Sequence, residues 1–144
     1  MTGTALGDRA RLLAAWSLLG FFRLLVAMTP FTFVRRLLGE DRGAHGSDDR
    51  PTLDVDQRWR AARISEIVQR AAARTPWTSD CFPQALTART FLAARRIPHV
   101  VDFGVRREAG GLAAHTWVSA GDVPVTGGDG TGWTRVGRFV WTAR

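Results

Sequence analysis

The spacing of apolar residues changes at Pro98, and no other feature of this sequence constrains the fold as strongly. Upstream, apolar side chains recur at helical intervals, whereas downstream short β-branched and aromatic runs alternate with turn signals. We therefore expect helices over about 8–28, 30–39, 56–74 and 78–96. Strands are expected over about 98–105, 112–119, 123–126 and 138–142. Helices followed by an antiparallel meander give an α+β fold.

A chain of 144 residues accommodates one small domain and an appendage. We divide it into an apolar N-terminal helical segment over 1–40, a linker over 41–55 and the main domain over 56–144. Residues 1–8 are small and polar, so we expect them to be disordered. The linker is charged and contains glycine, and His45 within it is interpreted as a solvated histidine.

The apolar run over 12–38 raises the question of a membrane span, which needs about 20 consecutive apolar residues. Arg23 interrupts the run and Pro30 divides it, so neither half is long enough, and a signal peptide matches poorly as well. We expect its two helices to pack on the domain or to dock a partner. Peripheral contact of residues 12–38 with a membrane surface is the alternative.

The net charge is +7, and all 20 basic residues are arginines. A solvated arginine-rich surface accounts for this charge, although it would also favour acidic partners or an anionic membrane. Nucleic-acid binding is not expected, because the sequence shows no zinc spacing, aromatic–basic platform or recognition helix. No cofactor or metal is expected either, since no phosphate-binding loop follows a strand and histidine and cysteine are not clustered.

Cys81 is the only cysteine, which excludes an intrachain disulfide and a cysteine-rich zinc site and suits a reducing, cytoplasmic location. Residues 78–80 are good N-cap residues, so Cys81 is predicted in the first turn of a helix, where Pro83 is also tolerated. Unpaired amide groups and the helix dipole at this end favour a thiolate and could stabilise an oxyanion. A core cysteine would sit more naturally in mid-helix. The position therefore favours a nucleophile.

His115 is the candidate base for this nucleophile. It lies in a predicted strand whose alternation places Ala113, His115 and Trp117 on one face. The small alanine leaves the imidazole accessible, and Trp117 could exclude solvent from it. A half-buried histidine that bonds to the backbone is the plain alternative. His99 follows Pro98 at a strand entrance, is expected at the surface, and is the weaker candidate for the base.

A carboxylate is expected to orient the imidazole, as in other Cys-His hydrolases. If the hairpin turns at residues 121–122, His115 faces roughly residue 128, which brings Asp129 close to a ring nitrogen. Asp122 lies in the turn itself and suits a turn-forming role. We prefer Asp129 for the orienting role, and Asp122 remains open.

Four segments in this order then suggest a family: WTSDCFPQALTA around Cys81, LAARRIP, FGV, and AHTWV around His115. Together they resemble the transglutaminase-like leader peptidases of lasso-peptide biosynthesis, over about residues 60–130. The apolar, arginine-bearing N-terminus resembles the standalone form of that family, in which the leader-recognition domain is a separate protein.

The resemblance implies a transglutaminase-like, papain-like cysteine hydrolase whose catalytic domain is 56–144. In that family Cys81 would attack the bond between leader and core peptide, His115 would move the proton, and an acid would hold His115. The family's acid corresponds in position to Gly127 here, and Asp129 follows two residues later. The implied partners are the precursor peptide, a leader-recognition protein and an ATP-using lasso cyclase.

Two alternatives stay open. The acyl-thioester could be attacked by an amine instead of water, which would make the protein a transglutaminase-type acyltransferase. The chain could also be a non-catalytic scaffold that uses this fold to bind a peptide.

Overall fold

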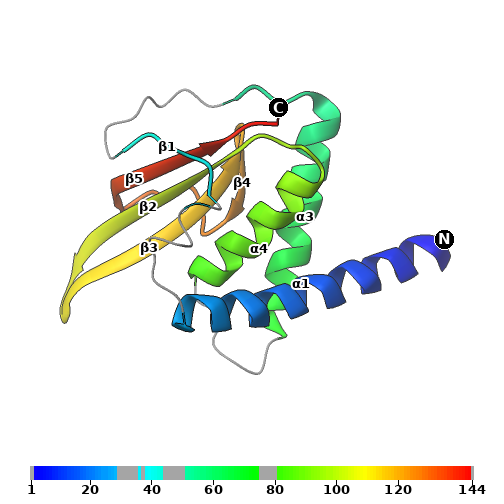
Figure 1. Cartoon of the computed structure of the whole chain (residues 1–144), viewed down its shortest axis with the longest axis horizontal. Helices are drawn as coiled ribbons and strands as arrows, with labels where there is room; N and C mark the ends of the chain where they lie inside the picture. The colour runs from blue at the N-terminus through cyan, green and yellow to red at the C-terminus, as the bar shows by residue number, and fades with distance from the viewer. Residues whose placement is uncertain (1, 29–35, 37, 44–50, 75–80, 144) are drawn as a thin grey trace.

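The computed structural model describes residues 2–28, 36, 38–43, 51–74 and 81–143. Its elements are α1 (Thr2–Met28), β1 (Glu40–Asp41), α3 (Val55–Ala73), α4 (Cys81–Ala94), β2 (His99–Glu108), β3 (Gly111–Ala120), β4 (Val123–Thr126) and β5 (Thr134–Trp141). The helices gather beside a five-stranded sheet, and the N-terminal end of α1 extends beyond α3 (Figure 1). The α+β class predicted from the sequence is confirmed.

The strands follow the order β1-β5-β2-β3-β4, and every pair is antiparallel. The predicted meander is therefore wrong for β5, which pairs with β2 instead of β4. The loop after β4 returns across the sheet: a Cβ on Gly130 would lie 2.6 Å from the Trp117 ring, and one on Gly104 would lie 3.0 Å from Cβ of Trp133. Glycines at these two positions allow the loop and the sheet to approach closely.

Helix α3 begins within one residue of its predicted start, and Cys81 lies in the first turn of α4 as the sequence predicts. Asp54 caps α3, and its carboxylate accepts a hydrogen bond from the backbone amide of Gln57, whose side chain accepts one from Asp54 in return. Cys81 is the first residue of α4, and Pro83 lies buried in its first turn. The predicted cap residues 78–80 and nearly all of the predicted helix 30–39 lie outside the described residues.

The N-terminal helix has two different apolar faces. One is buried against α3 and α4 through Ala15, Leu19 and Phe22. The other is open to solvent, with Leu24 60% and Met28 74% exposed. The helix begins at Thr2, so the disorder expected for residues 1–8 is wrong over 2–8, because an established helix extends at little cost. By length and composition alone, 7–28 could cross a membrane.

The boundary between the expected N-terminal segment and the expected linker belongs to the sheet. Glu40 and Asp41 form β1 opposite Val140 and Phe139. Gly39 precedes them at a φ of +117°, and a Cβ there would lie only 2.5 Å from the Val140 carbonyl oxygen. Only glycine permits this approach, which is why a segment without apolar periodicity still adds a strand.

The sheet has two faces of different character. The helix face packs on α3 and α4 and carries Val101, Phe103, Val118 and Phe139, which belong to or contact the main apolar core. Phe103 meets Phe82 of α4 with ring centroids 5.6 Å apart. The opposite face, which we call the loop face, carries a different set: Asp102, Gly104, His115, Trp117 and Arg138.

Candidate active site

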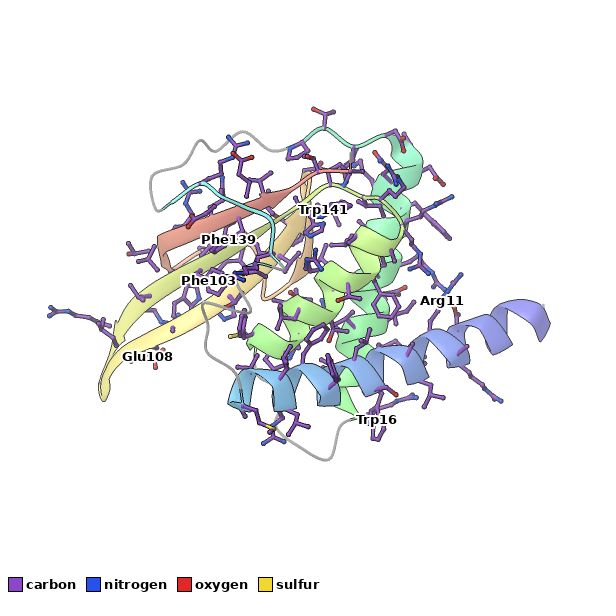
Figure 2. All side chains as sticks on the ribbon, viewed as in Figure 1. Arg11, Trp16, Phe103, Glu108, Phe139 and Trp141 are labelled. Atoms are coloured by element: carbon purple, nitrogen blue, oxygen red, sulfur yellow. The ribbon has the colours of Figure 1, made fainter. Side chains whose placement is uncertain are left out.

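A cavity of about 590 Å³ opens at the N-terminus of α4, and we call it the Cys81 cavity. Both Cys81 and His115 are among its lining residues. Its walls are mostly apolar, with contributions from Phe82, Phe103 and Phe139. Figure 2 shows Phe103 and Phe139 on the adjacent strands β2 and β5, and their ring centroids lie 5.7 Å apart. A concave apolar site beside a nucleophilic side chain is typical of a substrate pocket.

Cys81 is a free, partly exposed thiol at the first position of α4. The first turn of a helix presents backbone amides without intrahelical acceptors. These amides carry partial positive charge, and they can stabilise the oxyanion that forms when a thiolate attacks a carbonyl. The location therefore suits nucleophilic chemistry, as the sequence predicts.

The imidazole of His115 is held by aromatic rings and by the backbone. Its ring stacks 4.8 Å from Trp133 and 5.9 Å from Trp117, measured between centroids. Its Nε2 atom lies 2.7 Å from the carbonyl oxygen of Gly127. The stacking confirms that His115 and Trp117 share one face, and it adds Trp133, which sequence reasoning did not associate with the site.

That shared face is the loop face. His115 is directly opposite Gly104 in the β2–β3 register, whereas Thr116 is opposite Phe103, which packs on α4. Neighbours along a strand point to opposite faces. The structure thus places Cys81 and His115 on the wall of one cavity, but holds the imidazole on the far side of the sheet from α4. A Cys-His-Asp triad is not assembled in this arrangement.

The two candidate acids have other partners. A carboxylate oxygen of Asp129 accepts a hydrogen bond from the backbone amide of Thr131, at 2.9 Å. Asp122 pairs with Arg58 across 2.8 Å at an exposed position. The group that contacts the imidazole is the Gly127 carbonyl, at the position where the family resemblance led us to expect an acid. In the sequence, the only sign of this contact was the glycine at the position where the family has an acid.

His99 is fully buried, which corrects the expectation of a surface histidine. It stacks on Trp141, with ring centroids 5.2 Å apart, and its Nδ1 atom lies 3.0 Å from the Ile97 carbonyl oxygen. Burial lowers the pKa of His99 to about 4, with a smaller contribution from the charge of Arg89, against the raising effect of the Ile97 carbonyl. His99 begins β2, whereas the Cys81 cavity borders the middle of that strand, so His99 is not placed to serve Cys81.

The described side chains do not form a set of donors for a metal ion. Among the residues that the structure describes, no three histidine, cysteine or acidic side chains form a group that could hold a metal ion.

The model of the Transglutaminase-like superfamily matches residues 22–139, and the chain belongs to that superfamily. No curated protein and no solved structure matches the chain. Membership indicates activity of the cysteine peptidase or acyltransferase type.

Proposed function

We propose that this protein is a cysteine peptidase that removes the leader from a ribosomally made lasso-peptide precursor. The observation that carries the proposal is the presence of Cys81 and His115 on one cavity of a transglutaminase-like chain. The ordered sequence segments around both residues, which resemble the leader peptidases, support the finer assignment.

The proposed reaction proceeds through an acyl-enzyme. His115 accepts the thiol proton of Cys81, whose Sγ atom attacks the carbonyl carbon of the scissile bond, and amides of the first turn of α4 stabilise the oxyanion. The C–N bond breaks as His115 delivers a proton to the departing amine. Water then attacks the thioester, His115 accepts its proton, and the thiol and a new carboxylate are released. The sum is peptide plus water giving an acid and an amine.

This mechanism requires the imidazole to reach the helix face. A one-residue shift of β3 against its neighbours would exchange the faces of all its side chains. The sheet contains two irregularities beside these strands: β5 has Val136 as an extra residue opposite Phe103 and Gly104, and β4 has Val125 as an extra residue opposite Val118 and Ser119. Such bulges insert one residue and redirect the side chains that follow. We propose that the reactive form has His115 turned toward Cys81, with Asp129 as the orienting acid.

The cavity walls favour an apolar side chain of the substrate next to the scissile bond. Phe82, Phe103, Val105 and Phe139 would surround it, and Asp41 adds one acidic group to the lining. The proposed partners are the precursor peptide, a leader-recognition protein and an ATP-using lasso cyclase. We propose a cytoplasmic location, with peripheral membrane contact through the exposed face of α1.

The test is mass spectrometry of a candidate precursor incubated with the protein and its leader-recognition partner. Wild type is expected to cleave one bond, and Cys81→Ala and His115→Ala are expected to abolish cleavage. Asp129→Asn and Asp122→Asn form a matched pair, of which only the first should slow the reaction. Transfer of the acyl group to an added amine, without hydrolysis, would favour the acyltransferase. Binding of the precursor without either product would favour the scaffold.

A further inference from the structure

A second cavity, of about 320 Å³, lies where α1, α3 and the end of α4 meet. Four arginines from these three places line it, and we call it the arginine cavity: Arg11, Arg60, Arg63 and Arg95. Figure 2 shows Arg11 on the side of α1 that faces α3. Guanidinium groups present a fixed fork of donors that matches carboxylates and other oxyanions.

Three of the four guanidinium groups form ion pairs with nearby carboxylates. Arg63 lies 2.8 Å from Asp8 and 3.2 Å from Glu66. Arg60 pairs with Asp56 at 3.0 Å, and Arg11 approaches Asp8 at 3.7 Å. Four cations thus stand against three anions in and around the cavity.

Arg95 is the cation that remains. Within the described part of the chain it pairs with no carboxylate, and its guanidinium lies 5.7 Å from the centroid of the Phe91 ring. Burial lowers the pKa of Arg95, and the charges of Arg11 and Arg60 lower it further. An anion that entered the cavity would relieve this repulsion. The buried Nε atom of Arg63 also has no hydrogen-bond partner among the described residues.

The rest of the lining is apolar. Ile64, Ile67 and Phe91 contribute to it, and Trp59 borders it with 64% of its surface exposed. A free inorganic anion would use only the guanidiniums, whereas a peptide with acidic and apolar side chains would use both kinds of surface. We propose that the arginine cavity binds an acidic, apolar-containing peptide segment of a protein partner.

The arginine cavity lies far from the proposed reaction at Cys81. Cys81 begins α4 and Arg95 follows its end, so a helix of 14 residues puts them roughly 21 Å apart at about 1.5 Å per residue. The inference therefore does not depend on the proposed function, and it can be tested on protein that lacks the Cys81 thiol.

The test is fluorescence anisotropy of a short labelled peptide of glutamates and leucines, titrated with the full chain carrying Cys81→Ala. The control peptide has glutamine in place of every glutamate. Arg95→Gln is expected to weaken binding of the acidic peptide about tenfold, which is about 1.4 kcal/mol, because it removes a charge-assisted hydrogen bond. Arg107→Gln on the exposed β2–β3 hairpin removes the same charge elsewhere and should have little effect.

A circular-dichroism melt establishes that both variants are folded, and Arg60→Gln provides a second variant in the cavity. Equal weakening by Arg107→Gln would overturn the proposal in favour of general charge attraction. Equal binding of the glutamine peptide would overturn it in favour of an apolar groove. Inorganic phosphate that competes as strongly as the acidic peptide would also overturn it, because the apolar walls would then contribute nothing.

Discussion

His99 and His115 lie on opposite faces of the same sheet, and both stack on tryptophan rings. His99, on the helix face, is fully buried and its pKa is lowered to about 4. His115, on the loop face, is partly exposed and borders the Cys81 cavity. The histidine on the helix face is thus remote from the thiol, while the histidine beside the cavity is turned away from it. The comparison shows that strand register decides which face of the sheet each histidine reaches.

The largest effect is expected from the buried ion pair of the loop face. Arg138 donates two hydrogen bonds to Asp102, at 2.6 and 3.1 Å, and both side chains are almost completely buried. Arg138→Met would leave the carboxylate buried without its cation, and should lower the free energy of unfolding by about 3–5 kcal/mol. Urea denaturation measures this.

A matched control is Arg42→Met, which breaks an exposed pair with Glu40 and should cost about 1 kcal/mol or less. The double variant Asp102→Leu, Arg138→Met should recover much of the loss, because it leaves no uncompensated charge. If Arg138→Met costs no more than Arg42→Met, the ion pair of Asp102 and Arg138 is not buried as described above.

The next effect concerns His99 on the helix face, which should make the free energy of unfolding depend on pH. His99 is neutral in the folded protein down to about pH 4, whereas in the unfolded chain it takes up a proton near its ordinary pKa of 6.5. Stability from this residue is therefore fully present above about pH 6.5 and is lost as the pH falls toward 4. The loss is about 3 kcal/mol at most. Urea denaturation from pH 7 to pH 4 should show a steeper fall for wild type than for His99→Phe. Parallel curves would contradict the burial of His99.

A smaller effect is expected where the returning loop meets the loop face. Gly130 has a φ of +85°, and a Cβ there would lie 2.6 Å from the Trp117 ring, so Gly130→Ala combines backbone strain with a clash. We expect a loss of about 2–3 kcal/mol. Gly128→Ala is the control, because it has a φ of +79° but no atom within 4 Å of the added Cβ. It should cost about 1 kcal/mol. Equal thermal shifts would show that the loop does not pack on Trp117.

Local signals predicted much of this fold. The helical spacing over 56–74 defined α3 within a residue or so, and β4 occupies the predicted 123–126. These elements depend on neighbours in the sequence. The partner of β5 and the addition of β1 depend on contacts between distant segments, such as Gly39 against Val140, and no local pattern encodes them.

The candidate active site was likewise predictable where local sequence patterns determine the position of a residue. The position of Cys81 at a helix start and the common face of His115 and Trp117 followed from capping residues and strand alternation. Alternation says which residues share a face, but not which face meets the helices, because that depends on register across three strands. The Gly127 carbonyl beside His115 and the burial of His99 are likewise outcomes of tertiary packing.

The central claim is that Cys81 and His115 act as a pair, and the alkylation rate of Cys81 tests it most directly. Because Cys81 is the only cysteine, iodoacetamide reports on this thiol alone. We predict that His115→Ala slows alkylation near neutral pH about tenfold, since the proposed reactive form, in which the imidazole is turned toward the thiolate, can no longer form. His99→Phe, which alters the histidine remote from the cavity, should leave the rate unchanged. Equal rates for wild type and His115→Ala in folded protein would contradict the pairing and leave His115 as a residue of the loop face only.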